Sequence, residues 1–211
     1  MDIQQVNGVW VPSNDVHLQE WIAGKPFTQN KCLNEFLKHC EENDIKFNTV
    51  IDVGAWCGTW SLSICSLAEN IEAFEPDPTH YHCLEKNKTA NITCRNVALG
   101  EAEKQVGLSE DNFTQAKYIT AAGNVQMQTL DSYNFTNVDL IKIDVEGYEL
   151  SVLKGAERTL EQCKYLMIEL NNNSKRFKSN NSIIERWLSD KGFSVLIKTW
   201  PDVVFVNNYS I

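Results

Sequence analysis

The sequence predicts an α/β fold with a mostly parallel, doubly wound sheet that ends in an antiparallel β-hairpin. From about residue 48 to the C-terminus, strand-like and helix-like hydrophobic patterns alternate, as expected of βαβ units around a parallel sheet. The last two strand-like segments, residues 193–198 and 203–206, are separated by too few residues for a parallel return, so they must pair antiparallel. A chain of 211 residues is long enough for one domain with a substantial core.

Composition and charge narrow the classes of function. The chain is 43% hydrophobic and 22% charged, as in globular proteins, and its net charge of −9 disfavours a nucleic-acid partner because it repels phosphates. No stretch approaches the roughly 20 apolar residues of a membrane span. The N-terminus lacks the basic start and apolar run of a signal peptide, which favours a cytoplasmic location. Seven cysteines without a Cys-x-x-Cys pair argue against a disulfide framework or a zinc site.

Residues 1–47 are predicted to form an arm and a helix that precede the core at residues 48–211. Residues 9–12 have the pattern of a short strand or an extended arm. A helix is predicted to open at Thr28, because apolar side chains after it recur at helical spacing and can pack on the core. This apolar face consists of Cys32, Leu33, Phe36, Leu37 and Cys40.

Five parallel strands are predicted from short apolar runs. They lie at residues 49–53, 71–74, 93–98, 138–143 and 165–168. A helix is predicted from about Thr59, and another from Asp77, which can cap it while Pro78 occupies its first turn. Residues 103–129 have no strong pattern and are interpreted as a hairpin or short strands.

Two further helices are predicted in the second half of the core. The first follows the fourth strand, and its apolar face consists of Leu150, Leu153, Ala156 and Leu160. The second begins at Ser182, which forms a capping-box pattern with Glu185, and it ends at Gly192.

Two segments that follow strands have the residues of a nucleotide site. Residues 52–58, Asp-Val-Gly-Ala-Trp-Cys-Gly, contain two glycines that permit a tight turn and a close backbone approach to a ligand. Glu75 lies 21 residues after Gly54 at the tip of the second strand, where its carboxylate can accept hydrogen bonds from both hydroxyls of a ribose. In a doubly wound fold both segments open onto the crevice at the carboxyl ends of the strands.

The spacing of the glycines distinguishes two cofactors. Dinucleotide sites carry Gly-x-Gly-x-x-Gly, with the pyrophosphate at a helix N-terminus, whereas this loop is Gly-x-x-x-Gly. Asp52, two residues before the first glycine, would repel a pyrophosphate but can attract the ammonium of a methionine moiety. The pattern favours S-adenosylmethionine. A nicotinamide-dependent oxidoreductase, and a turn whose glycines only serve packing, are the alternatives.

Four blocks of sequence resemble the FkbM family of methyltransferases. They are residues 50–55, 72–76, 96–100 and 139–149, in the order of the family, and the Asp-Val-Glu-Gly of the last block is the most specific. The resemblance implies a Rossmann-like class I methyltransferase fold with S-adenosylmethionine as cofactor. It also implies transfer of a methyl group to oxygen, on a hydroxyl of a sugar, a glycan or another small hydroxylated acceptor.

The resemblance also assigns residues to the cofactor. The methionine end would meet the first glycine loop, the ribose would meet Glu75, and the adenine would meet residues 96–98. The family usually has a small polar residue in place of Trp56, and this departure keeps open a non-catalytic module that only binds the cofactor. The residues expected to bind the cofactor are Asp52, Gly54, Ala55, Trp56, Gly58, Glu75, Pro76, Asn96, Val97, Ala98 and Asp144.

Asp144 and Glu146 are the candidate catalytic carboxylates, since methylation of a hydroxyl requires its alignment and the removal of its proton. Asp144 is expected beside the transferring methyl group. Alternatively, Asp144 only orients the cofactor and Glu146 only stabilises the start of the next helix. His17 is a third candidate, because the region 1–47 is expected to cap the acceptor pocket. No paired ligand motif occurs, so a metal site is not expected.

Overall fold

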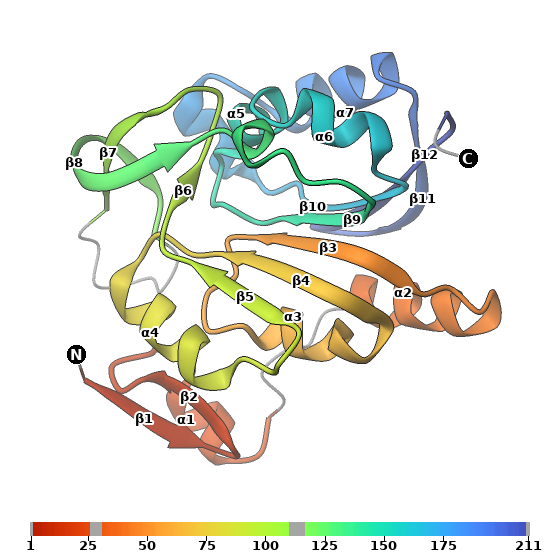
Figure 1. The fold of residues 1–211 in the computed structure, drawn as a ribbon. Helices are drawn as coiled ribbons and strands as arrows, with labels where there is room; N and C mark the ends of the chain where they lie inside the picture. Colours follow the sequence, from red (N-terminus) through yellow and green to blue (C-terminus); the bar gives the residue numbers. More distant parts are fainter. Residues whose placement is uncertain (1, 26–30, 110–116, 210–211) are drawn as a thin grey trace.

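A seven-stranded sheet forms the centre of the molecule in the computed structural model, which describes residues 2–25, 31–109 and 117–209 (Figure 1). Its order is β11-β12-β10-β9-β3-β4-β5. Strands β10, β9, β3, β4 and β5 pair in parallel, and β12 is antiparallel to both β10 and β11, so the predicted fold class is confirmed. The strands are β3 (Phe47–Val53), β4 (Ala68–Phe74), β5 (Ile92–Arg95), β9 (Val138–Ile143), β10 (Tyr165–Glu169), β11 (Phe193–Thr199) and β12 (Asp202–Asn207).

Helices cover both faces of this sheet (Figure 1). On one face lie α2 (Lys31–Glu42), α3 (Thr59–Ile64) and α4 (Pro78–Asn87), and on the other lie α5 (Glu149–Lys154), α6 (Glu157–Gln162) and α7 (Asn181–Asp190). Successive residues of β3 divide between the two cores: Val50 packs with α2 to α4, whereas Ile51 and Val53 pack with α5 to α7. The strands are therefore buried on both faces, which explains their continuous apolar runs.

The N-terminal arm is a small unit of its own. Strand β1 (Ile3–Val6) pairs antiparallel with β2 (Val9–Pro12), and α1 (Leu18–Ile22) completes a small apolar cluster with them. The strand predicted at residues 9–12 is confirmed, whereas its partner β1 was not predicted.

The side chain of Asn87, at the end of α4, fastens the arm to the core. Its Oδ1 accepts a hydrogen bond from the backbone N–H of Trp10 at 2.7 Å, and its Nδ2 donates to the carbonyl oxygens of Trp10 and Cys57, each at 2.8 Å. One amide thus connects the arm, α4 and the glycine loop.

Helix α2 packs with the core and not with the arm. Its Leu33 and Phe36 belong to the same buried cluster as Tyr165 of the central sheet. The predicted helix start at Thr28 lies outside the described residues. The division at residue 47/48 between arm and core remains a prediction.

A second sheet, with three strands in the order β6-β8-β7, contains β6 (Ala98–Leu99), β7 (Lys104–Leu108) and β8 (Ile119–Gln128). The predicted third strand was therefore wrong at its end, because β5 ends at Arg95 and Ala98 belongs to β6. The chain leaves the central sheet at Asn96, whose Nδ2 donates to the carbonyl oxygen of Glu75 at 2.8 Å.

The helix predicted across residues 150–160 is two helices. The carboxylate of Asp131 accepts hydrogen bonds from the N–H groups of Arg158 and Thr159, at 3.0 and 2.9 Å, and this gives α6 a start of its own. Gly155 lies at the break, where a Cβ would come within 1.9 Å of the carbonyl oxygen of Gly100. Tertiary contacts, which the local pattern does not contain, thus divide the helix.

The predicted capping box of α7 was wrong as well. The cap is Asn180, whose Oδ1 accepts from the N–H of Ile183 at 3.0 Å. Glu185 instead pairs with Lys198, at 2.7 Å between Oε1 and Nζ.

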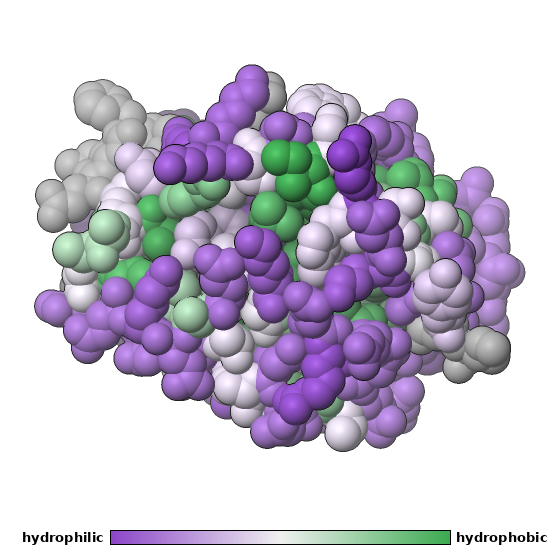
Figure 2. All heavy atoms as spheres, turned by 90° about the horizontal axis from the view of Figure 1, so that it is seen from above, coloured by the Kyte–Doolittle hydropathy of each residue, from purple (hydrophilic) through white to green (hydrophobic). Residues whose placement is uncertain are grey.

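Hydrophilic residues predominate on the face above α5 to α7, and hydrophobic residues occupy small areas between them (Figure 2). None of the helices in the described part of the chain has the length and apolar character of a membrane span.

Candidate active site

A cavity of about 540 Å³ lies at the carboxyl ends of the parallel strands, where doubly wound sheets bind their ligands. Its volume is in the usual range for small-molecule sites. The loops after β3, β4, β9 and β10 contribute to its wall, together with the arm and the second sheet. The predicted site residues that line it are His17, Gly54, Ala55, Trp56, Glu75, Pro76, Val97, Ala98, Asp144 and Glu146.

The glycine loop is held against the ends of two neighbouring strands. Gly54 has φ +77°, and a Cβ there would lie 1.9 Å from the carbonyl oxygen of Asp144. The N–H groups of Gly54 and Ala55 both donate to the carbonyl oxygen of Phe74, at 3.0 Å. The turn therefore requires glycine, and it brings the loop beside Asp144.

Glu75 is oriented by two backbone groups. The N–H of Trp56 donates to its Oε2 and the N–H of Asp77 to its Oε1, each at 2.8 Å. Glu75 is 6% exposed, its Oε1 also lies 3.7 Å from Nδ1 of His80, and a carboxylate with one backbone N–H on each oxygen has further lone pairs to accept from a ligand.

Trp56 connects this region to the arm. It has φ +51°, which is uncommon for a residue other than glycine. Its ring centroid lies 5.4 Å from that of Trp21 in α1 and 6.1 Å from that of His80 in α4. The strained backbone at Trp56 thus lies where the arm contacts the loop.

Asp52 does not line the cavity, in contrast to the expected contact with the methionine end. It is fully buried, and its Oδ2 accepts a hydrogen bond from Ser61 Oγ at 2.6 Å. Its Oδ1 lies 3.1 Å from Nζ of Lys142, which also donates to the carbonyl oxygen of Gly54 at 2.7 Å. Nζ of Lys142 is 3.6 Å from Oδ2 of Asp144. Asp52 thus pairs with the ammonium of Lys142, and not with the ammonium of a methionine moiety as expected.

Lys142 was not predicted as a site residue, although its sequence context carries a signal. Lys142 is a charged residue within the otherwise apolar end of β9, and a buried lysine requires partners. Burial alone would lower its pKa, but the carboxylates of Asp52 and Asp144 outweigh burial and raise the pKa above its ordinary value. Lys142 is therefore a charged member of the site.

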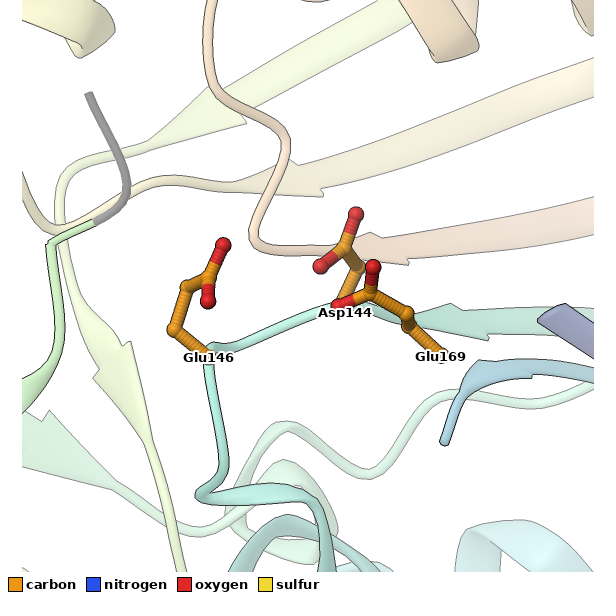
Figure 3. A group of neighbouring side chains, drawn as sticks. All are labelled: Asp144, Glu146 and Glu169. Carbon is orange, nitrogen blue, oxygen red and sulfur yellow. The ribbon is translucent and has the colours of Figure 1, made fainter. Parts of the chain in front are cut away.

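Three carboxyl groups gather at one end of the cavity (Figure 3). Asp144 and Glu146 follow β9, and Glu169 ends β10, with one oxygen of each within 4.8 Å of the others. Carboxylate oxygens at such separations can hold a divalent cation. Glu169, which the sequence analysis did not assign to the site, was recognisable as a carboxylate at the carboxyl end of a predicted strand.

The surroundings of these carboxyl groups differ. Glu146 has φ +55°, and its Oε2 accepts from Asn173 Nδ2 at 2.7 Å. Burial, followed by the charge of Asp144, raises the pKa of Glu146. Burial, again followed by Asp144, raises the pKa of Glu169 to about 9, so this carboxyl group is protonated at neutral pH.

Of three other predicted residues, Gly58 and Asn96 lie outside the lining of the cavity, whereas His17 lies in it, as expected. Gly58 begins α3 with φ +85°, and a Cβ there would meet Leu84 at 2.7 Å. Asn96 holds the loop after β4 through its amide, and neither residue lines the cavity. His17 lines it from the arm with a side chain that is 60% exposed, and its Nδ1 lies 3.6 Å from Glu20.

Known proteins resemble this chain in sequence and in fold. The hexuronic acid methyltransferase AglP of Haloferax volcanii is 26% identical over 145 residues, which are 64% of this chain and 59% of AglP. Methyltransferase FkbM from Methylobacillus flagellatus has a TM-score of 0.53 at 22% identity, over 76% of this chain and 43% of that one. Precorrin-6y C5,15-methyltransferase from Geobacter metallireducens has a TM-score of 0.51 at 13% identity, over 87% and 89% of the two chains.

This chain spans only part of the first two relatives, and the structural similarities establish the fold alone. The family itself follows from the sequence. The family model described as the methyltransferase FkbM domain matches residues 39–195, which is more than half of the chain. The match includes the glycine loop, Glu75 and the carboxyl cluster, so the chain belongs to the FkbM family of methyltransferases.

Proposed function

We propose that this chain is an S-adenosylmethionine-dependent O-methyltransferase that acts on a hydroxyl of a sugar or another small hydroxylated acceptor. One observation carries the proposal: a single cavity is lined by the glycine loop, by the Glu75 carboxylate and by the carboxyl cluster around Asp144. The glycine loop and Glu75 suit the binding of an adenosyl group, and the carboxyl cluster suits a hydroxyl that loses a proton.

The cofactor half of the cavity has groups that fit adenosine. Glu75 keeps lone pairs for the ribose hydroxyls, because each of its oxygens accepts only one backbone N–H. Val97 and Ala98 offer an apolar wall for adenine, and the backbone of Gly54 offers a close approach to the methionine end. The bound cofactor would supply a methyl group on a sulfonium.

The acceptor half provides groups that orient a hydroxyl and receive its proton. Asp144 lies 3.6 Å from Nζ of Lys142 and faces the cavity, where a carboxylate can act as a proton acceptor. Glu146 is the other candidate base. The protonated Glu169 can donate a hydrogen bond to an acceptor oxygen. His17 is a weaker candidate because its ring is mostly exposed.

The charge of this half favours a neutral acceptor. AglP is by name a hexuronic acid methyltransferase, and a hexuronate carries a carboxylate. Lys117 and Lys142 also line the cavity, but acidic residues outnumber lysines in its lining, which opposes the binding of an acceptor carboxylate. We therefore propose a neutral sugar or polyol as the acceptor.

The arm is proposed to cover the bound ligands. Asp15, Val16, His17 and Trp21 line the cavity, and Trp21 contacts Trp56 of the glycine loop. An arm in this position excludes water from the site, which favours methyl transfer to the acceptor.

Two measurements test the proposal in order. Calorimetric titration should detect binding of S-adenosylmethionine and S-adenosylhomocysteine, and the absence of binding to the folded chain would contradict the proposal. Methyl transfer should then be faster to glucose-type neutral sugars than to the matching uronic acids. Binding without transfer to any sugar, lipid, peptide or nucleic acid would instead favour a non-catalytic binding module.

A further inference from the structure

Lys142 is the point at which the glycine loop and the carboxyl cluster meet. It lies in β9 with 7% of its surface exposed, directly opposite Asp52 of β3 in the parallel register. Its Nζ contacts three oxygen atoms: the carbonyl oxygen of Gly54 at 2.7 Å, Oδ1 of Asp52 at 3.1 Å and Oδ2 of Asp144 at 3.6 Å.

The two carboxylates beside Lys142 have different surroundings. Asp52 is fully buried and is bound on its other side by Ser61, so it has no route to a ligand in the cavity. The side chain of Asp144 is 41% exposed and lines the cavity. Asp52 therefore balances the charge of the buried lysine, and the lysine is left to act on Asp144.

We infer that Lys142 is a positioning residue for methyl transfer, which holds the carboxylate of Asp144 at the glycine loop while Asp52 serves as its counter-ion. The inference rests on the proposed function for its consequence in turnover. The backbone N–H of Asp144 donates to the carbonyl oxygen of Val53 at 3.0 Å, whereas its side chain forms an ion pair with Lys142 on the side of the glycine loop and has Glu169 as a hydrogen-bonding neighbour in the carboxyl cluster. Without the ammonium, that carboxylate would turn away from the loop.

The cofactor loop itself has other supports. Gly54 and Ala55 donate to Phe74, and Trp56 donates to Glu75, so the loop keeps its shape without Lys142. Loss of the lysine charge should therefore lower turnover far more than cofactor affinity. A displacement of about 1 Å at a reacting group costs up to roughly 100-fold in rate.

The variant Lys142→Met keeps the length of the side chain but leaves Asp52 as an uncompensated buried charge, which destabilises the fold. The double variant Asp52→Asn/Lys142→Met removes that charge and keeps an acceptor for Ser61. We expect the double variant to recover most of the melting temperature lost by Lys142→Met. Its single-turnover rate should stay roughly 10- to 100-fold below wild type, with affinity for S-adenosylhomocysteine within about threefold. Recovery of the wild-type rate would show that Lys142 is only structural.

A second comparison, with every protein in the Asp52→Asn background so that no buried charge is left uncompensated, asks whether Lys142 acts through Asp144. If Lys142 acts through Asp144, adding Lys142→Met to Asp144→Asn should lower the rate by less than about threefold, whereas independent roles would give a multiplied loss. Lys154→Met is the matched control, because Lys154 lies outside the cavity and pairs with Glu101 on the surface at 3.4 Å. It should keep the rate of the Asp52→Asn background.

A crystal structure of the double variant separates this inference from the proposed function. The carboxylate of Asp144 should lie away from its position beside the glycine loop, and an unchanged position would overturn the inference. This result is decisive even if wild type methylates no acceptor, which would contradict the proposed function alone.

Discussion

Glu75 is held by two backbone N–H groups, so the direction of its carboxylate does not depend on a ligand. If it binds the ribose through two charge-assisted hydrogen bonds, Glu75→Ala should weaken binding of S-adenosylhomocysteine by about 2–4 kcal/mol. Calorimetric titration measures this loss. Glu85→Ala, which replaces a half-buried carboxylate that pairs with Lys88 and does not line the cavity, is the control. If the Glu75 variant binds S-adenosylhomocysteine with wild-type affinity, Glu75 does not bind the cofactor.

Asp144 should affect a different step. Asp144→Asn keeps the size of the side chain but removes a charge and a proton acceptor, so single-turnover rates should fall by roughly 10²–10⁴-fold. Affinity for the cofactor should change much less. If the variant keeps the wild-type rate, the base is another residue, and Glu146→Gln becomes the decisive variant.

Glu169 makes stability depend on pH. Burial, together with nearby carboxylates, raises its pKa from an ordinary 4.5 to about 9. Between these values the folded chain keeps a proton that the unfolded chain has lost, so this carboxyl group lowers stability as the pH rises through that range. Glu169→Gln should flatten the decline in the free energy of unfolding between about pH 5 and pH 9, measured with urea and a chelator present. An unchanged slope would contradict the raised pKa.

Residue types indicate where the candidate cavity lies better than they indicate the contacts of each side chain. Gly54, Glu75 and Asp144 were recognisable because each follows a strand, and strand ends share one edge of the sheet. Asp52 fits the same pattern, yet Lys142 binds its carboxylate, and this depends on the register between β3 and β9. The spacing of residues within one segment does not reveal how that segment pairs with a distant one.

At the scale of elements, the cap of α7 offers a direct test. Asn180→Ala removes the acceptor for the N–H of Ile183, and the free energy of unfolding should fall by about 1 kcal/mol. Ser182→Ala is the matched variant on the same turn and should have almost no effect. If a urea titration shows instead that Ser182→Ala lowers the free energy of unfolding more than Asn180→Ala, the capping box predicted from the sequence would be correct.

Elements were predictable where burial alone determines them. The five parallel strands have continuous apolar runs because helices cover both faces of the sheet, and all five occur close to their expected positions. The break between α5 and α6 depends on Asp131, more than 20 residues away along the chain. Strand β5 ends early because Asn96 binds the loop after β4. These boundaries are set by tertiary hydrogen bonds, which periodicity does not reveal.

At the scale of the whole molecule, the side chain of Asn87 makes two hydrogen bonds to the arm and one to the glycine loop, beside the packing of Trp21 on Trp56. Asn87→Ala should release the arm without unfolding the core, because the two large core clusters contain no residue of the arm. Limited proteolysis should then cut within the arm several-fold faster than in wild type. Asn43→Ala, at an exposed amide that hydrogen-bonds to His39 of α2, is the control. Equal cleavage rates for the two variants would mean that other contacts hold the arm.

The shared amide of Asn87 has a thermodynamic consequence. Arm closure and the order of the glycine loop depend on the same side-chain amide, so a ligand that orders the loop also stabilises the closed arm. Linkage requires the two effects to be equal: the factor by which the closed arm raises ligand affinity is the factor by which the bound ligand favours the closed arm. A tenfold gain in one corresponds to about 1.4 kcal/mol and fixes a tenfold gain in the other. Hydrogen exchange of the backbone N–H groups in residues 3–22, measured at increasing cofactor concentration, would therefore show how strongly the bound ligand stabilises the arm.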